Sequence, residues 1–220
     1  MKYVFLGAFC AASLLHLYFC LKENKKGRNA TKPFLVIMLL LYYVFSAGSV
    51  CWLLLAALLT SWLGDVLLMP KGNRWFIAGG ISFGVAHACF VLAYATKIDF
   101  AKVKWPWIIP VALIYLTASA LVMRKITPNA PKYMVLPIWF YFLANSAMNV
   151  FAFLLLQTVP CAGSGLAMTG AVLFFLSDCL LMLFRYEKEP KNVGRKQFAV
   201  MVTYILAQFF ITQGILLIGK

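Results

Sequence analysis

Two uncharged stretches constrain most tightly how this chain can fold. No Asp, Glu, Lys or Arg lies between Lys32 and Asp65, or between Lys132 and Asp178. Because about 20 apolar residues cross roughly 30 Å of hydrocarbon, each stretch is too long for one transmembrane helix. Each also contains a break rich in small residues, at 46–49 and at 160–165, where a helical hairpin can turn. Both stretches are therefore expected to cross a membrane twice.

The composition agrees with a chain that folds in a bilayer. Apolar residues make up 64% of the sequence, charged residues only 12%, and the mean hydropathy is +0.88. We predict an all-α, polytopic bundle of about eight transmembrane helices that forms a single domain over residues 1–220. The expected spans are Tyr3 to Leu21, Pro33 to Gly48, Val50 to Met69, Trp75 to Thr96, Trp105 to Met123, Tyr133 to Val159, Cys161 to Phe184 and Phe198 to Ile218.

The first apolar run has a second interpretation, as a secretory signal peptide, because it follows Lys2. However, it is nearly long enough to span, and a basic segment at residues 22–28 follows it in place of a small-residue cleavage site. This stop-transfer pattern predicts a retained helix.

The formal charge of +14 is distributed as in a membrane protein and not as in a nucleic-acid-binding protein. Fifteen of the 20 Lys and Arg residues lie in alternate loops, near residues 22–32, 71–74, 124–132 and 185–197. A nucleic-acid-binding protein would instead gather them on one water-exposed face. By the positive-inside rule, these loops face the cytoplasm and both termini face away. A glycan at the Asn29 sequon would contradict this orientation.

The sequence lacks the motifs of several common chemistries. Its six Cys residues are scattered singly through the apolar runs without a Cys-x-x-Cys pair, which is typical of small buried residues and not of a metal site. There is no Gly-x-Ser-x-Gly elbow, no His-Glu-x-x-His and no phosphate-binding loop. We therefore expect no bound metal and no cofactor.

A short internal repeat relates the two halves of the chain. The segment 63–69, Leu-Gly-Asp-Val-Leu-Leu-Met, shares five of its seven residues with the segment 176–182, Leu-Ser-Asp-Cys-Leu-Leu-Met. Asp occurs only three times in the chain, so the shared Asp carries most of the weight. The pattern predicts two parallel four-helix pseudo-repeats, approximately 1–96 and 105–218, related by an axis along the membrane normal.

Asp65 and Asp178 are the main candidates for catalysis. They are the only acidic residues within the expected spans, where an unpartnered charge is costly. Both precede a basic loop by a similar number of residues, so both should lie roughly 9–10 Å inside the same boundary. If they face each other, burial and mutual repulsion favour one protonated acid beside one ionised carboxylate. The alternative is that each is a structural acid, paired with a basic neighbour or capping a backbone break.

Six further polar residues could complete a site. They are Lys32, His87, Asn145, Asn149, Tyr204 and Gln208. The two Asn residues lie one helical turn apart, as do Tyr204 and Gln208, so each pair either joins helices or lines a cavity. His87 is either a packed, hydrogen-bonded residue or a catalytic one. Lys32 is either an interfacial anchor or a ligand for a lipid phosphate.

These motifs resemble the lysoplasmalogenases, the YhhN-like membrane proteins, over nearly the whole chain. In order, they are Thr31-Lys32-Pro33, Ser61 to Asp65, Ala86-His87, Leu176-Ser177-Asp178 and Tyr204 to Gln208. The resemblance implies hydrolysis of the vinyl ether bond of lysoplasmalogens to a fatty aldehyde and glycerophosphoethanolamine or glycerophosphocholine. It also implies the endoplasmic reticulum membrane. The expected partners are a lysophospholipid substrate and the bilayer, with a homodimer as the assembly to consider and no nucleic acid.

The candidate residues suit this chemistry. Cleavage begins with protonation of the outer alkene carbon, which leaves an oxocarbenium ion that water attacks. One of Asp65 and Asp178 would donate the proton, and the other would stabilise the cation or deprotonate water, as paired carboxylates do in glycosidases. The substrate phosphate would reach Lys32 or other basic residues. Two alternatives remain open from the sequence, a proton-coupled small-molecule transporter and a lipid-binding membrane protein.

Overall fold

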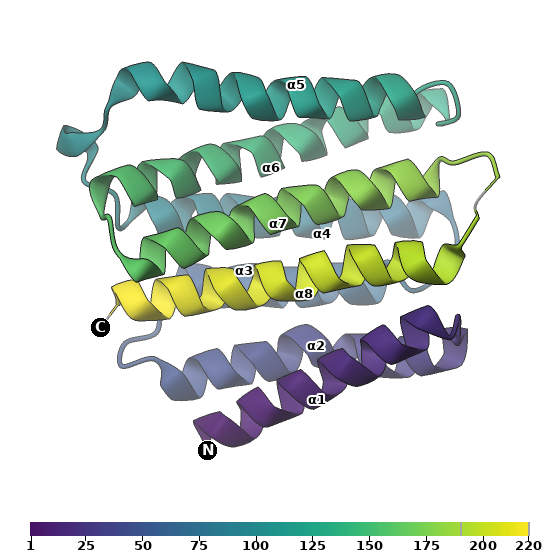
Figure 1. The fold of residues 1–220 in the computed structure, drawn as a ribbon, viewed down its shortest axis with the longest axis horizontal. Coiled ribbons are helices and arrows are strands. Elements are labelled where there is room, and N and C mark those ends of the chain that lie inside the picture. Colours follow the sequence, from purple (N-terminus) through teal and green to yellow (C-terminus); the bar gives the residue numbers. More distant parts are fainter. Residues whose placement is uncertain (190, 220) are drawn as a thin grey trace.

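The computed structural model describes residues 1–189 and 191–219, which contain eight α-helices. Consecutive helices run in opposite directions, and both termini lie at the same end of the bundle (Figure 1). The helices are α1 (Lys2–Leu21), α2 (Lys25–Ser46), α3 (Trp52–Leu67), α4 (Asn73–Ala95), α5 (Ile108–Ile126), α6 (Lys132–Thr158), α7 (Ala162–Arg185) and α8 (Val193–Ile218). Two short 3₁₀ helices, η1 (Phe100–Lys102) and η2 (Trp105–Trp107), precede α5.

The prediction of an all-helical membrane bundle is confirmed over the described residues. Seven helices are long and apolar enough to cross a membrane. The third, α3, has only 16 residues and is shorter than predicted. At about 1.5 Å per residue it covers roughly 24 Å, which is less than the roughly 30 Å of a bilayer's hydrocarbon core.

The second helix begins earlier than predicted. Asn24 caps it by accepting a hydrogen bond from the Gly27 amide at 3.0 Å, so α2 starts at Lys25 and not at Pro33. Pro33 therefore lies inside the helix, where it provides no backbone donor. The indole Nε1 of Trp62 in α3 donates to the Pro33 carbonyl at 2.9 Å. This bond fixes α2 against α3 at the depth of the candidate site.

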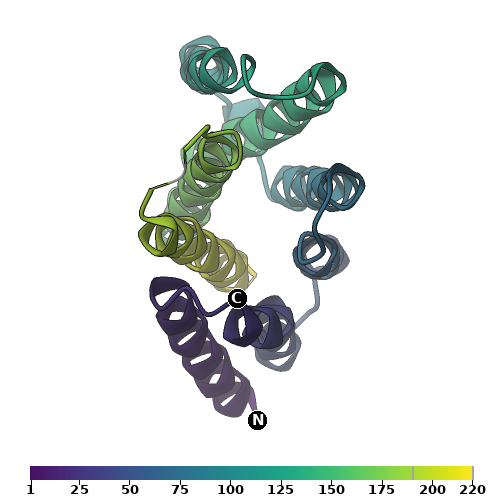
Figure 2. The ribbon, with the colours of Figure 1, turned by 90° about the vertical axis from the view of Figure 1, so that its right-hand side faces the viewer.

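The helices form two facing pairs that are closed at both edges. Viewed from the end, α3 and α4 lie opposite α7 and α8, with α1 and α2 at one edge and α5 and α6 at the other (Figure 2). Aromatic side chains fill the space between the facing pairs. The ring of Phe83 lies 6.2 Å from that of Phe174 and 5.9 Å from that of Tyr204, both edge-on. The candidate residues on α3, α4, α7 and α8 therefore point toward a common interior.

The distribution of polar residues is the reverse of that in a water-soluble protein. Large apolar side chains lie on the outer surface, among them Ile109, Ile114 and Phe140, each more than 60% exposed. Polar side chains are instead buried, including all of the candidate residues except Lys32, which is partly exposed. This arrangement fits a bundle whose outer surface contacts lipid and whose polar groups find partners inside.

Glycines allow α7 and α8 to pack with close backbone contact. A Cβ atom added at Gly170 would lie 2.8 Å from the Ala207 carbonyl oxygen, and one at Gly214 would lie 2.5 Å from that of Gly163. Small residues at such crossings are a common means of helix association in membranes. The contact fixes α8, which carries Tyr204, against α7, which carries Asp178.

The loops that join α1 to α2, α3 to α4, α5 to α6 and α7 to α8 gather at the end of the bundle opposite the termini (Figure 1). These are the four basic loops identified in the sequence. We call this end of the molecule the basic end.

Candidate active site

Asp65 lies in the last turn of α3 and is 3% exposed. Its two carboxylate oxygens have different partners. The hydroxyl of Tyr204 in α8 donates to Oδ2 at 2.7 Å, and the Lys32 Nζ atom lies 3.3 Å from Oδ1. Asp65 is therefore a buried carboxylate with one cationic and one neutral partner, supplied by two other helices.

The position of Lys32 is set by its neighbours along α2. The Thr31 hydroxyl donates to the Gly27 carbonyl at 2.9 Å and lies 2.8 Å from Nδ1 of the buried His16. On the other side, Pro33 accepts the Trp62 hydrogen bond. With both flanking residues fixed, the Lys32 side chain is directed toward Asp65.

Asp178 lies in α7, 5% exposed, and its polar contacts all fall on one oxygen atom. The Tyr141 hydroxyl and the Asn145 amide, both from α6, donate to Oδ2 at 2.7 and 2.6 Å. His87 Nε2 in α4 is 3.9 Å from the same oxygen. Among the described residues, no Lys or Arg pairs with Asp178, and its Oδ1 atom has no hydrogen-bond partner.

The two acids line a single small cavity of about 80 Å³, which we call the acid chamber. Lys32, Tyr141 and Tyr204 also contribute to its wall. From the sequence we expect both acids to be buried and close to each other. In the structure both are buried, and both line this cavity. The chamber brings together acids from α3 and α7 with a hydrogen-bond donor for each.

Asn149 and Gln208 reach the acids only through another residue. Asn149 donates to the Asn145 side chain and carbonyl, both at 3.0 Å, and Gln208 donates to the Tyr204 hydroxyl at 3.3 Å. His87 is fully buried between aromatic rings, and neither ring nitrogen has a hydrogen-bond partner among the described residues. The group nearest to its Nε2 atom is the Asp178 carboxylate, whose Oδ2 atom lies 3.9 Å away.

Sequence reasoning missed Tyr141. It lies four residues before Asn145 and therefore on the same face of α6, one turn closer to the basic end. This spacing was the available signal, but a Tyr in an aromatic-rich span does not stand out from its neighbours.

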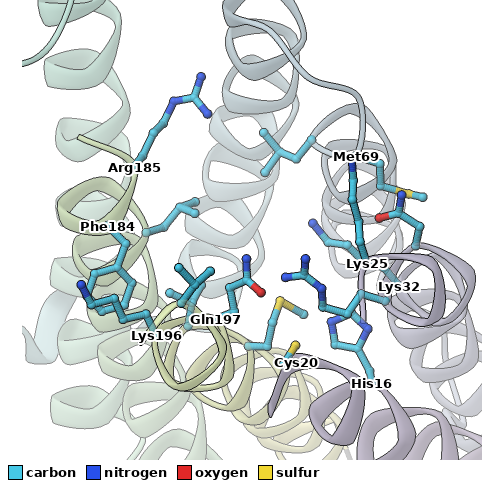
Figure 3. A pocket seen from close by; sticks show the side chains of 16 residues that line it. His16, Cys20, Lys25, Lys32, Met69, Phe184, Arg185, Lys196 and Gln197 are labelled. Atoms are coloured by element: carbon cyan, nitrogen blue, oxygen red, sulfur yellow. The ribbon is translucent and has the colours of Figure 1, made fainter. Parts of the chain in front are cut away.

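A larger polar cavity of about 460 Å³ opens at the basic end, between α1, α2, α7 and α8 (Figure 3). We call it the basic basin. Its cationic lining residues are Lys25, Arg28, Lys32, Arg185 and Lys196. No acidic residue lines it within the described part of the chain. Lys32 and four apolar residues line both the basin and the acid chamber, so the two cavities adjoin.

The polar groups that line the basin are only partly satisfied by neighbouring residues. The Arg28 Nε and Gln197 Oε1 atoms are buried without a hydrogen bond to any described residue. Lys196 pairs with Glu187, and Arg185 donates to the Asn73 side chain at 3.0 Å. The basin therefore holds more positive charge than its surroundings neutralise, which suits an anionic group.

A helical bundle with buried, hydrogen-bonded carboxylates around an internal cavity defines a polytopic membrane protein with a candidate acid/base site. The YhhN family matches residues 27–215, and the chain belongs to that family. It is 28% identical over 212 residues to lysoplasmalogenase TMEM86B of Rattus norvegicus, an alignment that covers 94% of this chain and 82% of that protein. No solved structure matches the chain. The predicted family is confirmed, and lysoplasmalogenase function is supported at the level of the family.

Proposed function

We propose that this protein is a lysoplasmalogenase, which hydrolyses the vinyl ether bond of lysoplasmenylethanolamine or lysoplasmenylcholine. The observation that carries the proposal is the acid chamber, in which Asp65 and Asp178 line one cavity beside a basic basin. The family match and the similarity to a lysoplasmalogenase point to the same chemistry.

The reaction needs one proton donor and one carboxylate. A proton is transferred to the outer carbon of the alkene, and the electron pair of the double bond forms the new C–H bond. The positive charge is shared by the inner carbon and the ether oxygen. Water then adds to the inner carbon and loses a proton, and the hemiacetal collapses to an aldehyde and a glycerol hydroxyl. Paired carboxylates serve a similar cation in glycosidases.

We assign the donor role to Asp178 and the stabilising role to Asp65. The partners of Asp178 donate only to Oδ2, which leaves Oδ1 as the atom that can carry and deliver a proton. Asp65 has a cationic partner in Lys32, and a carboxylate in an ion pair is suited to remain ionised. Asp65 would then stabilise the oxocarbenium ion or take the proton from the attacking water.

The basic basin would hold the phosphate of the substrate. Lys32 lines both cavities, so a phosphate near Lys32 and Arg28 would lie next to a vinyl ether in the acid chamber. Arg and Lys are the residues that bind phosphate most effectively, through charge-assisted hydrogen bonds.

The orientation and location are also proposals. The basic end would face the cytoplasm by the positive-inside rule, in an endoplasmic reticulum membrane. Asn29 lines the basin at this end. Because N-linked glycans are added on the side away from the cytoplasm, this orientation predicts that Asn29 carries no glycan. A mass shift on removal of N-linked glycans from Asn29 would reverse the orientation.

The direct test compares two substrates. Purified protein is incubated with a lysoplasmalogen and with its saturated ether analogue, which has no alkene to protonate. Release of fatty aldehyde from the first and none from the second is expected. Equal consumption of both, or of neither, would contradict the proposal. Transport of unchanged solute into proteoliposomes, without any aldehyde, would favour a transporter instead.

A further inference from the structure

A second, apolar cavity adjoins the acid chamber on the side away from the basin. It is a groove of about 360 Å³ between α4 and α6, within the size range of small-ligand pockets. We call it the α4–α6 groove. Its wall includes Ile77, Met134 and Ile138, and its outer rim includes Ile81 and Phe140. Because the two rim residues are 64% and 63% exposed, the groove opens on the surface that contacts lipid.

Two glycines keep this groove open. A Cβ atom added at Gly80 or at Gly84 would meet no atom within 4 Å. By contrast, a Cβ at the adjacent Gly79 would lie 2.7 Å from the Leu68 side chain. Gly79 therefore serves packing between α4 and α3, whereas Gly80 and Gly84 face space that no side chain of the described residues fills.

The groove is continuous with the site of the chemistry. Phe76, Gly80, Tyr141 and Met182 line both the groove and the acid chamber. Tyr141 is the residue whose hydroxyl donates to Asp178 Oδ2 at 2.7 Å. A chain lying in the groove would thus end beside Tyr141, at the entrance to the chamber that Asp178 lines.

At the basic end the groove is closed by polar contacts between three helices. The Arg185 guanidinium of α7 lies 3.7 Å from the centre of the Phe76 ring and donates to Asn73 in α4. Asn73 in turn donates to the Tyr133 hydroxyl of α6 at 2.7 Å. These contacts separate the groove from the basin near the surface, so the two cavities meet through the acid chamber.

We propose that the α4–α6 groove binds the hydrocarbon chain of the substrate and admits it sideways from the bilayer. The three cavities then match the three parts of a lysolipid in order: a polar basin for the phosphate, a chamber with two acids for the vinyl ether, and an apolar groove for the single chain. The proposal rests on the proposed function and adds the path of the chain and the residues that limit its length.

The test places bulk in the groove without disturbing the packing. A Cβ atom at Gly84 would meet no atom within 4 Å, so Gly84→Leu begins its side chain in open space, and Leu also has a higher helix propensity than Gly. Gly7→Leu is the matched control, because Gly7 is an exposed glycine of α1 with equally open surroundings. For a long-chain lysoplasmalogen, kcat/KM should fall by about 10-fold or more in Gly84→Leu, since a hydrophobic pocket loses roughly that for each displaced methylene contact. A short-chain substrate should lose less than about threefold, and Gly7→Leu should match the unmodified protein with both substrates.

Equal losses for the long and the short chain, or unchanged activity in Gly84→Leu, would overturn the proposal. A second measurement does not depend on turnover. A saturated ether lysolipid with a photoreactive group on its chain should label peptides of α4 and α6, and Gly84→Leu should reduce that labelling. Labelling there without any aldehyde release from a lysoplasmalogen would contradict the proposed function but leave the groove assignment standing. Labelling spread over all helices, or crosslinking of two copies through α4 and α6 in place of lipid labelling, would overturn the groove assignment.

Discussion

Substitution of Lys32 by Met yields a stability prediction that can be worked from the structure. The Nζ atom lies 3.3 Å from Asp65 Oδ1, and the two side chains are 18% and 4% exposed. Lys32→Met keeps most of the length of the side chain but removes its charge, and it leaves the Asp65 carboxylate buried with Tyr204 as its partner. Removing one member of a buried ion pair costs about 3–5 kcal/mol. Because Lys32 is partly exposed, we expect the lower end of this range, about 3 kcal/mol.

The assay is thermal unfolding of the purified protein in detergent. For a chain of this size each kcal/mol shifts Tm by about 2–4 °C, so Lys32→Met should lower Tm by roughly 6–12 °C. The double variant Lys32→Met/Asp65→Asn should recover most of this loss, because it buries no unpaired charge. Lys97→Met is the control, since Lys97 is exposed in the α4–η1 loop and should change stability by less than about 0.5 kcal/mol.

Two results would refute this reasoning. Lys32→Met could be as stable as the unmodified protein, in which case the ion pair does not hold α2 to α3. Alternatively, the double variant could be as unstable as the single one, in which case Lys32 acts through something other than Asp65. The double variant should also release no aldehyde despite its recovered stability, which separates the structural role of the pair from its catalytic role.

Three further predictions address the chemistry and the packing. Tyr141→Phe removes a hydrogen bond to Asp178 and should slow aldehyde release by about 10- to 100-fold. The control is Tyr115→Phe, which should have little effect because the Tyr115 hydroxyl has no hydrogen bond to the described residues. Equal rates of aldehyde release in the two variants would count against the role of Tyr141. Gly170→Ala places a Cβ atom against the α8 backbone and should lower stability by about 1–3 kcal/mol in thermal unfolding. A Cβ atom at Gly165, on the same helix, meets nothing within 4 Å, so Gly165→Ala should not lower stability. Similar Tm values for the two variants would contradict the close α7–α8 contact. Hydrolysis in D₂O, with immediate reduction of the aldehyde, should place one deuterium on the carbon next to the carbonyl carbon, and an unlabelled product would argue against protonation at carbon.

The sequence predicted the helical architecture because the membrane imposes a strong pattern on it. Uncharged runs of spanning length, separated by basic loops, are visible without knowledge of tertiary contacts. The two acids could also be identified as candidate site residues from the sequence alone. An Asp within an apolar span is energetically costly, so it usually has a functional role. That the repeats are related by a membrane-normal axis stays a prediction, as do the catalytic roles of the candidate residues.

Other features depend on contacts that leave little trace in one sequence. The start of α2 at Lys25 depends on the Asn24 cap, while Pro33 suggested a boundary further along the chain. The partnership of Tyr141 with Asp178 depends on how α6 is rotated against α7. The α4–α6 groove exists because no side chain packs against Gly80 and Gly84. The sequence does not indicate this, since a glycine in a membrane helix ordinarily marks close packing between helices.

The central claim is that Asp178 delivers a proton to the alkene carbon beside Asp65. The most direct measurement is the rate of aldehyde release from a lysoplasmalogen by purified Asp178→Asn protein, in which the amide keeps the shape of the side chain but cannot serve as the acid. The account predicts a rate lower by about 100- to 10,000-fold, in a protein that remains inserted in the membrane and unfolds within a few degrees of the unmodified one. Aldehyde release at the unmodified rate by this folded variant would contradict the account.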